Sequence, residues 1–222
     1  TVILMQITND ITGGKNRMKA LVLFSGGVDS TTCLGMAIDK YGKDNVIALS
    51  VSYGQKHDKE IKAADDIAKY YGVEHLYLDL AKIFQYSNCS LLKSSDEEIP
   101  EESYASQLEK TDGNPVSTYV PFRNGLFLSS AASIAISKDC QVIYYGAHAD
   151  DAAGNAYPDY SSAFNNAISE AIYIGSGNAL RVEAPFVNLT KAQVVAIGLK
   201  LKVPYELTWS CYEGKDKPCG VC

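Results

Sequence analysis

The chain has 222 residues and a net charge of −6 at pH 7; 46% of its residues are apolar and 21% are charged. This length suits one large α/β domain, alone or with a small appendage. The acidic balance excludes a general electrostatic attraction to nucleic acid or anionic lipid, and no apolar run approaches the roughly 20 residues that span a bilayer. We therefore expect neither nucleic acid nor a membrane as a partner.

The beginning of the chain and its cysteines both indicate a cytoplasmic protein. In residues 1–17 the apolar stretch comes first and the charges follow, which is the reverse of a secretory signal peptide. Met18 opens MKALVLF, so we interpret residues 1–17 as an N-terminal extension outside the fold. Three of the six cysteines stand far apart and three crowd the last twelve residues, which is not the framework of a disulfide-bonded secreted protein.

The first part of the chain alternates strands and helices. A continuous apolar run predicts a strand over Ala20–Phe24 that is buried on both faces, and apolar residues at helical spacing predict a helix over Asp29–Tyr41. The next segments predict a strand over Val46–Tyr53, a helix over Asp58–Tyr71 and a strand over His75–Leu80. Because short connections join them, these elements predict a parallel sheet with right-handed crossovers.

This alternation is interrupted once and then resumes. Residues 87–118 are rich in Ser, Glu, Asp and Lys and poor in apolar residues, which predicts a polar insertion or a mobile lid. Further helices and strands are then expected over Gly125–Lys138, Gln141–Tyr145, Ser161–Ile174, Leu180–Glu183 and Lys191–Lys200, the last one capped by Thr190. The predicted fold is a doubly wound α/β domain over residues 18–205 with about five parallel strands.

The string SGGVDS, from Ser25 to Ser30, lies between the first strand and the first helix. Its glycines let main-chain N–H groups turn toward an anion without side-chain clashes, and the helix N-terminus adds partial positive charge. Asp29 can hold a magnesium ion or cap the helix. The spacing is too short for Walker A and does not match G-x-G-x-x-G. At the end of a buried strand, the string predicts a phosphate-binding loop rather than a plain tight turn.

SGGVDS resembles the PP-loop of the ATP-pyrophosphatase superfamily, whose members bind ATP and release pyrophosphate as they adenylate an oxygen of the substrate. Four later strings narrow the resemblance: SYGQKHDKE, VPFRNGLFLSSAASIA, GAHADDAAGNAYPD and EAPFVNLTKAQVVAIGLKLKVPYELTWSCYEG. Together, over residues 18–222, they resemble the 7-cyano-7-deazaguanine synthase family of deazapurine and queuosine biosynthesis. The resemblance implies a homodimer that uses ATP and Mg²⁺ to convert 7-carboxy-7-deazaguanine and ammonia to the nitrile, through an adenylated carboxylate and an amide.

The loop and the resemblance together give the candidate site. Catalytic roles are expected for Asp29, Ser30, His57 and Arg123. His57 alone could equally be structural, but it follows the second strand, where open α/β sheets bind ligands. Arg123 starts a helix, where it is either a solvated cap or a fixed partner for phosphate or carboxylate. The expected ATP-binding residues are Phe24, Ser25, Gly26, Gly27, Val28, Asp29, Ser30, Thr31, Thr32, Cys33, Leu34 and Lys191.

A loop rich in Gly and Asp, residues 146–159, follows the fourth predicted strand. Asp150, Asp151 and Asp159 either are ordinary solvated residues or accept hydrogen bonds from the edge of a purine-like substrate. Many members of the resembling family carry Cys-Arg or a similar polar pair after YPD, whereas this chain has Tyr160 and Ser161. If that Arg binds substrate elsewhere in the family, its role is unfilled here or falls to Arg123 or Arg181.

The end of the sequence reads CYEGKDKPCGVC and contains Cys211, Cys219 and Cys222. A CxxC pair next to Pro and Gly is typical of a metal knuckle, and structural zinc takes four ligands. The resembling family has a fourth cysteine shortly after the position of Cys222, where this sequence ends. We predict a zinc-binding segment over residues 206–222. A redox CxxC is the rival interpretation, but no helix start follows it to lower a thiol pKa.

Four functions stay open from the sequence. The first is the nitrile-forming synthase, and the second is a close relative that stops at the amide or acts on another carboxylated deazapurine. The third is a tRNA-modifying PP-loop enzyme, which the acidic charge and the absence of an appended basic domain disfavour. The fourth is a non-enzymatic module that binds zinc and nucleotide.

Overall fold

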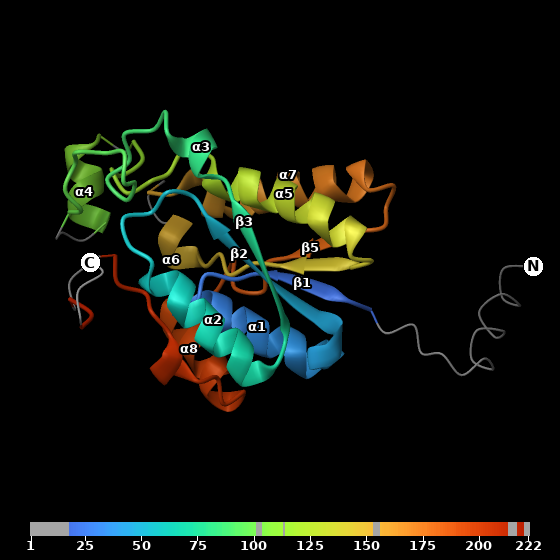
Figure 1. Ribbon diagram of the computed structural model, residues 1–222. Coiled ribbons are helices and arrows are strands. Elements are labelled where there is room, and N and C mark those ends of the chain that lie inside the picture. The colour runs from blue at the N-terminus through green and yellow to red at the C-terminus, as the bar shows by residue number, and fades with distance from the viewer. Residues whose placement is uncertain (1–17, 101–103, 113, 153–155, 213–216, 220–222) are drawn as a thin grey trace, which may run out of the picture.

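A five-stranded, fully parallel sheet organises the molecule (Figure 1). The computed structural model describes residues 18–100, 104–112, 114–152, 156–212 and 217–219. The sheet order is β3-β2-β1-β4-β5, so the predicted parallel sheet of five strands is confirmed. The bounds are β1 Ala20–Leu23, β2 Val46–Ser52, β3 Glu74–Asp79, β4 Val142–Tyr144 and β5 Arg181–Glu183.

Helices cover both faces of the sheet, as in a doubly wound fold (Figure 1). Helices α1 (Val28–Tyr41), α2 (Lys59–Tyr71) and α8 (Lys191–Lys200) lie on one face. Helices α5 (Arg123–Ser137) and α7 (Ser162–Gly175) lie on the other. The short helical segments are η2 Lys43–Asn45, α3 Ala81–Phe84, α4 Tyr104–Lys110, α6 Ala149–Ala152, η4 Pro158–Tyr160 and η5 Tyr205–Leu207. In the described part of the chain, none of the helices has both the length and the apolar character needed to cross a membrane.

The strands β1 and β4 are apolar throughout because each face of the sheet has its own core. Successive side chains of a strand point to opposite faces. Thus Ala20 and Val22 of β1 pack against the α1 side, while Leu21 packs against the α5 side. In β4, Val142 packs against the α1 side and Ile143 packs against the α5 side. This double burial holds the carboxyl ends of β1 and β4 in fixed positions, and the candidate site lies at those ends.

Two helix starts carry the caps that their sequences favour. The Thr190 side chain accepts a hydrogen bond from the Gln193 N–H, and Gln193 bonds back to the Thr190 N–H, which completes a capping box for α8. The predicted cap at Thr190 is therefore confirmed. Ser161 caps α7 by accepting from the Phe164 N–H. Both caps fix helix N-termini near the same edge of the sheet.

The segment 87–118 has more structure than its polar composition predicted. It includes α4, and its Cys89, Leu91 and Leu92 are buried in a small apolar cluster with Tyr53 and Phe84. The sequence predicted a polar insertion or a mobile lid, and these three residues show that part of the segment packs against the rest of the fold. A few apolar side chains suffice because β2 and α3 already provide the other half of the cluster. The insertion thus forms a wall beside the carboxyl end of β2.

Candidate functional site

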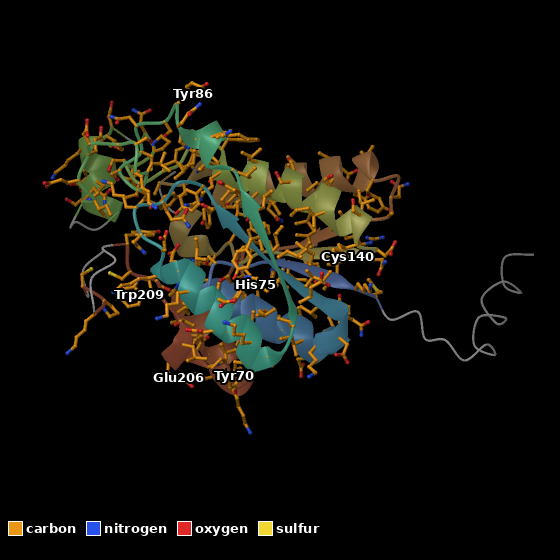
Figure 2. All side chains as sticks on the ribbon, viewed as in Figure 1. Tyr70, His75, Tyr86, Cys140, Glu206 and Trp209 are labelled. Atoms are coloured by element: carbon orange, nitrogen blue, oxygen red, sulfur yellow. The ribbon has the colours of Figure 1, made fainter. Side chains whose placement is uncertain are left out.

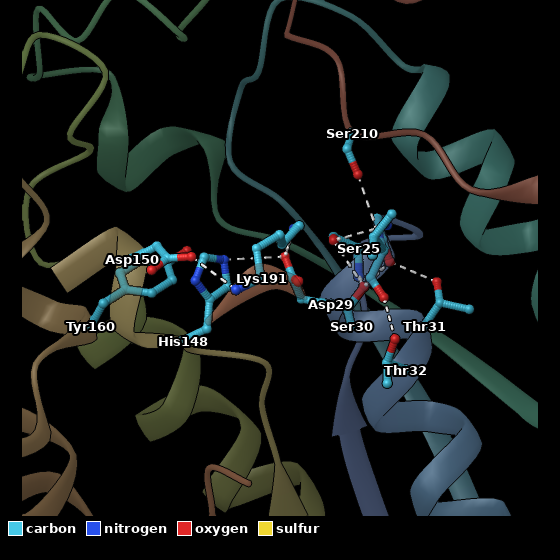
Figure 3. A network of polar contacts seen from close by, with 12 residues as sticks. Ser25, Asp29, Ser30, Thr31, Thr32, His148, Asp150, Tyr160, Lys191 and Ser210 are labelled. Carbon is cyan, nitrogen blue, oxygen red and sulfur yellow. Dashed lines mark hydrogen bonds and ion pairs between the residues drawn. The ribbon is translucent and has the colours of Figure 1, made fainter. Parts of the chain in front are cut away.

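A cavity of about 400 Å³ lies at the carboxyl ends of β1, β2 and β4. In this strand order the connections leave β1 and β4 toward opposite sides of the sheet, and ligands of doubly wound folds bind at such a switch point. Side chains from several separate stretches of the chain line the cavity, including the SGGVDS loop, the start of α2 and the start of α5. We call the part formed by Ser25, Gly27, Asp29, Ser30 and Lys191 the loop end (Figure 3).

The loop end depends on two glycines where the backbone is crowded. Gly26 has φ +82°, and a Cβ there would lie 2.5 Å from the Ala64 nitrogen of α2. A Cβ on Gly146, after β4, would lie 3.1 Å from the Asp29 carbonyl carbon. Any larger residue would push the loop away from α2 or push β4 away from α1. The glycines therefore serve close packing between the loop, α2 and β4, a role that the sequence analysis did not predict.

Hydroxyl oxygens hold the N–H groups of the loop end (Figure 3). The Ser25 N–H donates to Ser30 Oγ at 3.2 Å, and the Gly27 N–H donates to Ser25 Oγ at 3.3 Å. The Val28 N–H, at the start of α1, donates to Ser210 Oγ at 3.2 Å. These bonds are long, and their acceptors are mobile hydroxyl oxygens that the oxygens of an anion can replace. The loop end therefore presents three main-chain N–H groups whose present acceptors are side-chain hydroxyl oxygens.

Asp29 lies at the centre of the polar network in Figure 3. Its Oδ2 pairs with Lys191 Nζ at 2.5 Å and lies 3.6 Å from His148 Nε2. Its Oδ1 is buried without a hydrogen-bond partner among the described residues. An unpartnered buried carboxylate oxygen is costly, and a cation or a metal-bound water would satisfy it. The network joins two residues predicted for the site, Asp29 and Lys191, that are 162 positions apart.

A C-terminal stretch that the sequence analysis did not assign to the site completes the loop end. The Trp209 N–H donates to the Gly26 carbonyl at 3.0 Å, and Ser210 Oγ accepts from Val28 as above. Lys59 Nζ lies 4.7 Å from the centre of the Trp209 ring, which is labelled in Figure 2. The string TWS could have been suspected only because it precedes Cys211, since nothing local places it on the loop.

The opposite side of the cavity is lined mostly by aromatic residues, and we call Tyr53, Arg123, Phe127, Tyr160 and Tyr212 the aromatic end. Arg123 Nη2 donates to the Tyr160 hydroxyl at 3.2 Å, and the guanidinium lies 5.2 Å from the centre of the Tyr53 ring. The Tyr53 and Phe127 rings are 5.9 Å apart. No carboxylate of the described residues lies within 4.0 Å of this guanidinium, so its charge stays available to an anion.

Two of the aspartates of the Gly/Asp-rich loop stabilise helix starts. Asp159 is buried, and its Oδ2 accepts from the Asn124 N–H at 2.8 Å in the first turn of α5. Burial raises the pKa of Asp159, although the Asn124 hydrogen bond opposes this. Asp150 Oδ2 accepts from the Lys191 N–H at 2.8 Å. The Asp151 side chain lies outside the description. Asp159 therefore orients α5, and through it Arg123, rather than facing a ligand directly.

Glu60, in the first turn of α2, is a cavity residue that the sequence analysis missed. Burial raises the pKa of its carboxyl to about 7, although Arg123 acts in the opposite direction. Among the described residues no hydrogen bond or ion pair holds this carboxylate. Its signal in the sequence was only its place after the second strand, in the string SYGQKHDKE.

Several predicted residues lie near the cavity but do not line it. His57 does not line the cavity, its Nδ1 is buried without a hydrogen-bond partner among the described residues, and burial lowers its pKa. Thr31 and Thr32 are buried and donate to the carbonyls of Gly27 and Val28. Cys33 and Leu34 are fully buried in the core on the α1 side. Of the predicted ATP-binding residues, the structure brings to the cavity Phe24, Ser25, Gly27, Asp29, Ser30 and Lys191.

The predicted zinc segment is described only in part. The Cys219 N–H donates to Cys211 Sγ at 3.3 Å, which brings two of the three cysteines together. Cys222 lies outside the described residues. In the part of the chain that is described, no group of three or more His, Cys, Asp or Glu side chains has the arrangement of a metal site.

Comparisons with known proteins agree with this geometry. The profile of the family described as "Queuosine biosynthesis protein QueC" matches residues 19–222. Proteins named 7-cyano-7-deazaguanine synthase from Archaeoglobus fulgidus and Thermoplasma acidophilum are each 42% identical to the chain, over 92% and 93% of its length and 82% and 84% of theirs. The solved structure of U34-tRNA thiolase NcsA from Methanococcus maripaludis shares 18% identity at a TM-score of 0.51, and the match covers 95% of this chain and 67% of that one.

Proposed function

The chain belongs to the family of queuosine biosynthesis protein QueC, and from this premise we propose that it is a 7-cyano-7-deazaguanine synthase, an ATP-dependent ligase. It takes 7-carboxy-7-deazaguanine and ammonia as substrates. Relatives about 40% identical over some 92% of the chain carry that enzyme name. The observation that carries the proposal is one cavity that joins a loop whose N–H groups donate to hydroxyl oxygens to an arginine that lies among aromatic rings and has no ion pair among the described residues.

We assign ATP to the loop end. Its phosphates replace the hydroxyl oxygens on the N–H groups of Ser25, Gly27 and Val28, and Lys191 adds a positive charge. The adenine lies toward the end of β2, where Phe24 and Ser50 line the cavity. This arrangement leaves the α-phosphorus in the middle of the cavity, between the two ends. An adenylation needs such alignment and charge stabilisation more than a protein nucleophile, so no nucleophile is assigned.

We assign the heterocyclic acid to the aromatic end. A flat deazapurine can stack among Tyr53, Phe127 and Tyr212, and its carboxylate can pair with the fork of Arg123. Tyr160 replaces the polar pair found in many members of the resembling family. Here its hydroxyl accepts from Arg123, so it orients the guanidinium instead of supplying a second one.

The reaction consumes two ATP molecules in this scheme. A carboxylate oxygen attacks the α-phosphorus, and pyrophosphate leaves. Ammonia then attacks the acyl carbon, AMP leaves with the C–O bonding electrons, and one N–H proton is lost to give the amide. The amide oxygen attacks a second ATP in the same way. Loss of AMP and of the remaining two N–H protons gives the nitrile.

Two metal ions fit residues of this chain. Oδ1 of Asp29 is buried and unpartnered, which suits Mg²⁺ with its preference for carboxylate and phosphate oxygens. When bound, Mg²⁺ would neutralise the triphosphate. The N–H···Sγ bond between Cys219 and Cys211 brings two cysteines together, and zinc would take both thiolates, with Cys222 as a further ligand. Zinc would serve structure, because it would hold Trp209 and Ser210 on the loop.

The test is direct. The full-length protein is incubated with ATP, Mg²⁺, ammonium and 7-carboxy-7-deazaguanine, and the products are identified by mass spectrometry. We expect the nitrile together with AMP and pyrophosphate. An amide as final product would restrict the function to the first half of the reaction. No acid-dependent release of pyrophosphate would overturn the proposal. Light scattering in the same preparation tests the homodimer that the family implies.

A further inference from the structure

The nitrogen nucleophile of the proposed reaction must lose three protons, and the cavity therefore needs a proton acceptor. Ammonia becomes bound to carbon as a protonated amine, and the nitrile nitrogen carries no hydrogen. A base placed beside this nitrogen accelerates such steps by roughly 10²–10⁴-fold. The titratable groups that line the cavity are, from α1 to the C-terminal segment, Asp29, Tyr53, Glu60, Arg123, Tyr145, His148, Tyr160, Lys191 and Tyr212.

We propose that the Glu60 carboxylate is this general base, and this inference rests on the proposed function. In the amide-forming step the C–N bond forms, the C–O bond to AMP breaks, and one nitrogen proton moves to a Glu60 oxygen. In the second adenylation the amide oxygen bonds to the α-phosphorus, pyrophosphate leaves, and a second nitrogen proton moves to the same Glu60 oxygen. In the nitrile-forming step the C–O bond to the second AMP breaks as the last N–H proton moves to that oxygen. Glu60 releases each proton to water before it accepts the next.

The position of Glu60 supports this role. Its main-chain oxygen lies against Gly26, 2.7 Å from where a Cβ would stand, so α2 starts directly beside the phosphate-accepting loop. Its side chain lines the same cavity as Arg123 and is close enough for that positive charge to affect its ionisation. Glu60 therefore lies between the residues assigned to ATP and the residue assigned to the substrate carboxylate. The bond to nitrogen forms in this region.

The other acidic groups of the cavity are already engaged. Asp29 pairs with Lys191 and lies close to His148, and the tyrosines Tyr53 and Tyr145 have pKa values raised by burial. Glu60 has no hydrogen bond or ion pair among the described residues. Its pKa of about 7 leaves it ionised in part at neutral pH and basic enough to take a proton.

The variant Glu60→Gln distinguishes a role of Glu60 as proton acceptor from a role in binding the substrates. The amide side chain keeps the size of Glu60 and removes its basicity. The variant should still exchange labelled pyrophosphate into ATP when the heterocyclic acid is present, since adenylation of the acid needs no proton acceptor on nitrogen. Nitrile formation should fall by about 10²-fold. Asp66→Asn, an exposed carboxylate on the same helix, is the matched control and should behave as wild type. Circular dichroism checks that each variant folds.

The pH profile gives a second readout. In the wild type, nitrile formation under ammonia saturation should fall tenfold per pH unit below about 7, because the protonated carboxyl cannot accept a proton. Glu60→Asp should retain this limb, and Glu60→Gln should lose it. Unchanged nitrile formation in Glu60→Gln would overturn the proposal, and so would an equal loss of exchange and nitrile formation, because either result removes Glu60 from the nitrogen steps. If the wild-type protein shows no acid-dependent exchange, the proposed function itself fails.

Discussion

The two ends of the cavity are built in different ways. At the loop end, Ser25, Gly27 and Ser30 bond to one another within one strand–turn–helix unit, and distant residues add contacts to it. The aromatic end brings together Tyr53, Arg123 and Tyr160, which come from the end of β2, the start of α5 and the short helix η4. A local unit carries its chemistry in a short string, whereas a site assembled from distant segments exists only in the folded sheet.

In the proposed function, the loop end therefore serves the general step, which is the binding of ATP, and the aromatic end serves the specific step, which is the recognition of one acid. A loop that grips phosphate through backbone N–H groups recognises any nucleoside triphosphate tail and says little about the acid that is adenylated. The aromatic end supplies a fixed positive charge and flat surfaces, which can distinguish one heterocyclic acid from another. Substitutions at the loop end should therefore impair all ATP chemistry, while substitutions at the aromatic end should impair only the use of the acid.

The largest effect is expected at the loop end. Asp29→Asn removes the carboxylate that pairs with Lys191 and the buried oxygen assigned to Mg²⁺. Acid-dependent pyrophosphate release should fall by about 10³-fold, as when one preorganised electrostatic contact to a transition state is lost. Asp39→Asn, an exposed residue of the same helix, is the control. Activity close to wild type in Asp29→Asn would remove the metal-bound nucleotide from the loop end.

A loss of about 10²-fold is expected at the aromatic end from Arg123→Met. The substitution removes the guanidinium but keeps an apolar side chain of similar length between Tyr53 and Tyr160. The value of kcat/KM for the heterocyclic acid should fall, because a buried charged hydrogen bond to the carboxylate is lost. The KM for ATP should stay near its wild-type value. Arg181→Met is the matched control, since Arg181 also lies over a tyrosine ring, 4.9 Å from the centre of Tyr173, but outside the cavity.

If Arg123→Met raised the KM for ATP as much as the KM for the acid, the division of the cavity into two ends would be wrong. The guanidinium would then contact the nucleotide. A third possibility, equal activity of Arg123→Met and Arg181→Met, would place the substrate carboxylate elsewhere.

Removal of the zinc that we propose for the C-terminal segment should affect the loop end by a smaller amount. Trp209 and Ser210 each make one hydrogen bond to the loop, and each such bond contributes about 1 kcal/mol. If zinc holds this stretch in place, a chelator or Cys211→Ser should weaken ATP binding by about 10–30-fold in calorimetry. Cys140→Ser, at a buried cysteine elsewhere in the chain, should keep both metal content and affinity. Loss of metal without loss of affinity would separate the zinc segment from the site.

The contrast between a local unit and a site assembled from distant segments also explains which parts of the fold and the site the sequence could predict. The strand at Ala20–Leu23, the loop with Asp29 and Ser30, and the cap at Thr190 all follow from residues within a few positions of one another. Glu60, Ser210 and Tyr212 could not be placed, because each reaches the cavity only through packing of a helix or terminal segment on a distant loop. Cys89, Leu91 and Leu92 stand among polar residues in the sequence, and their burial depends on contacts with Tyr53, after β2, and Phe84, in α3.

The smallest expected effect concerns the floor of the cavity between the two ends. Ser50 Oγ donates to the Phe24 carbonyl at 2.6 Å and lies 2.8 Å from Nε2 of His75, which is labelled in Figure 2. Because the Ser50 proton is already used, Nε2 must carry a proton and donate. Burial lowers the pKa of His75 in the folded protein, although the nearby Asp65 opposes this. The neutral ring therefore belongs to the folded state.

This lowered pKa gives the sign of a pH effect on stability. The unfolded chain binds a proton at His75 below about pH 6.5, whereas the folded chain resists protonation until a lower pH. The contribution of His75 to the free energy of unfolding should thus be constant above about pH 6.5. As the pH drops below this value, this contribution should fall. In His75→Gln, whose amide can still donate to Ser50, urea unfolding between pH 5 and 6.5 should show a shallower decline than in the wild type. Equal slopes of the unfolding free energy against pH in the two proteins would mean that the floor does not depend on a neutral His75. An acid effect on the cavity would then have to act through its two ends.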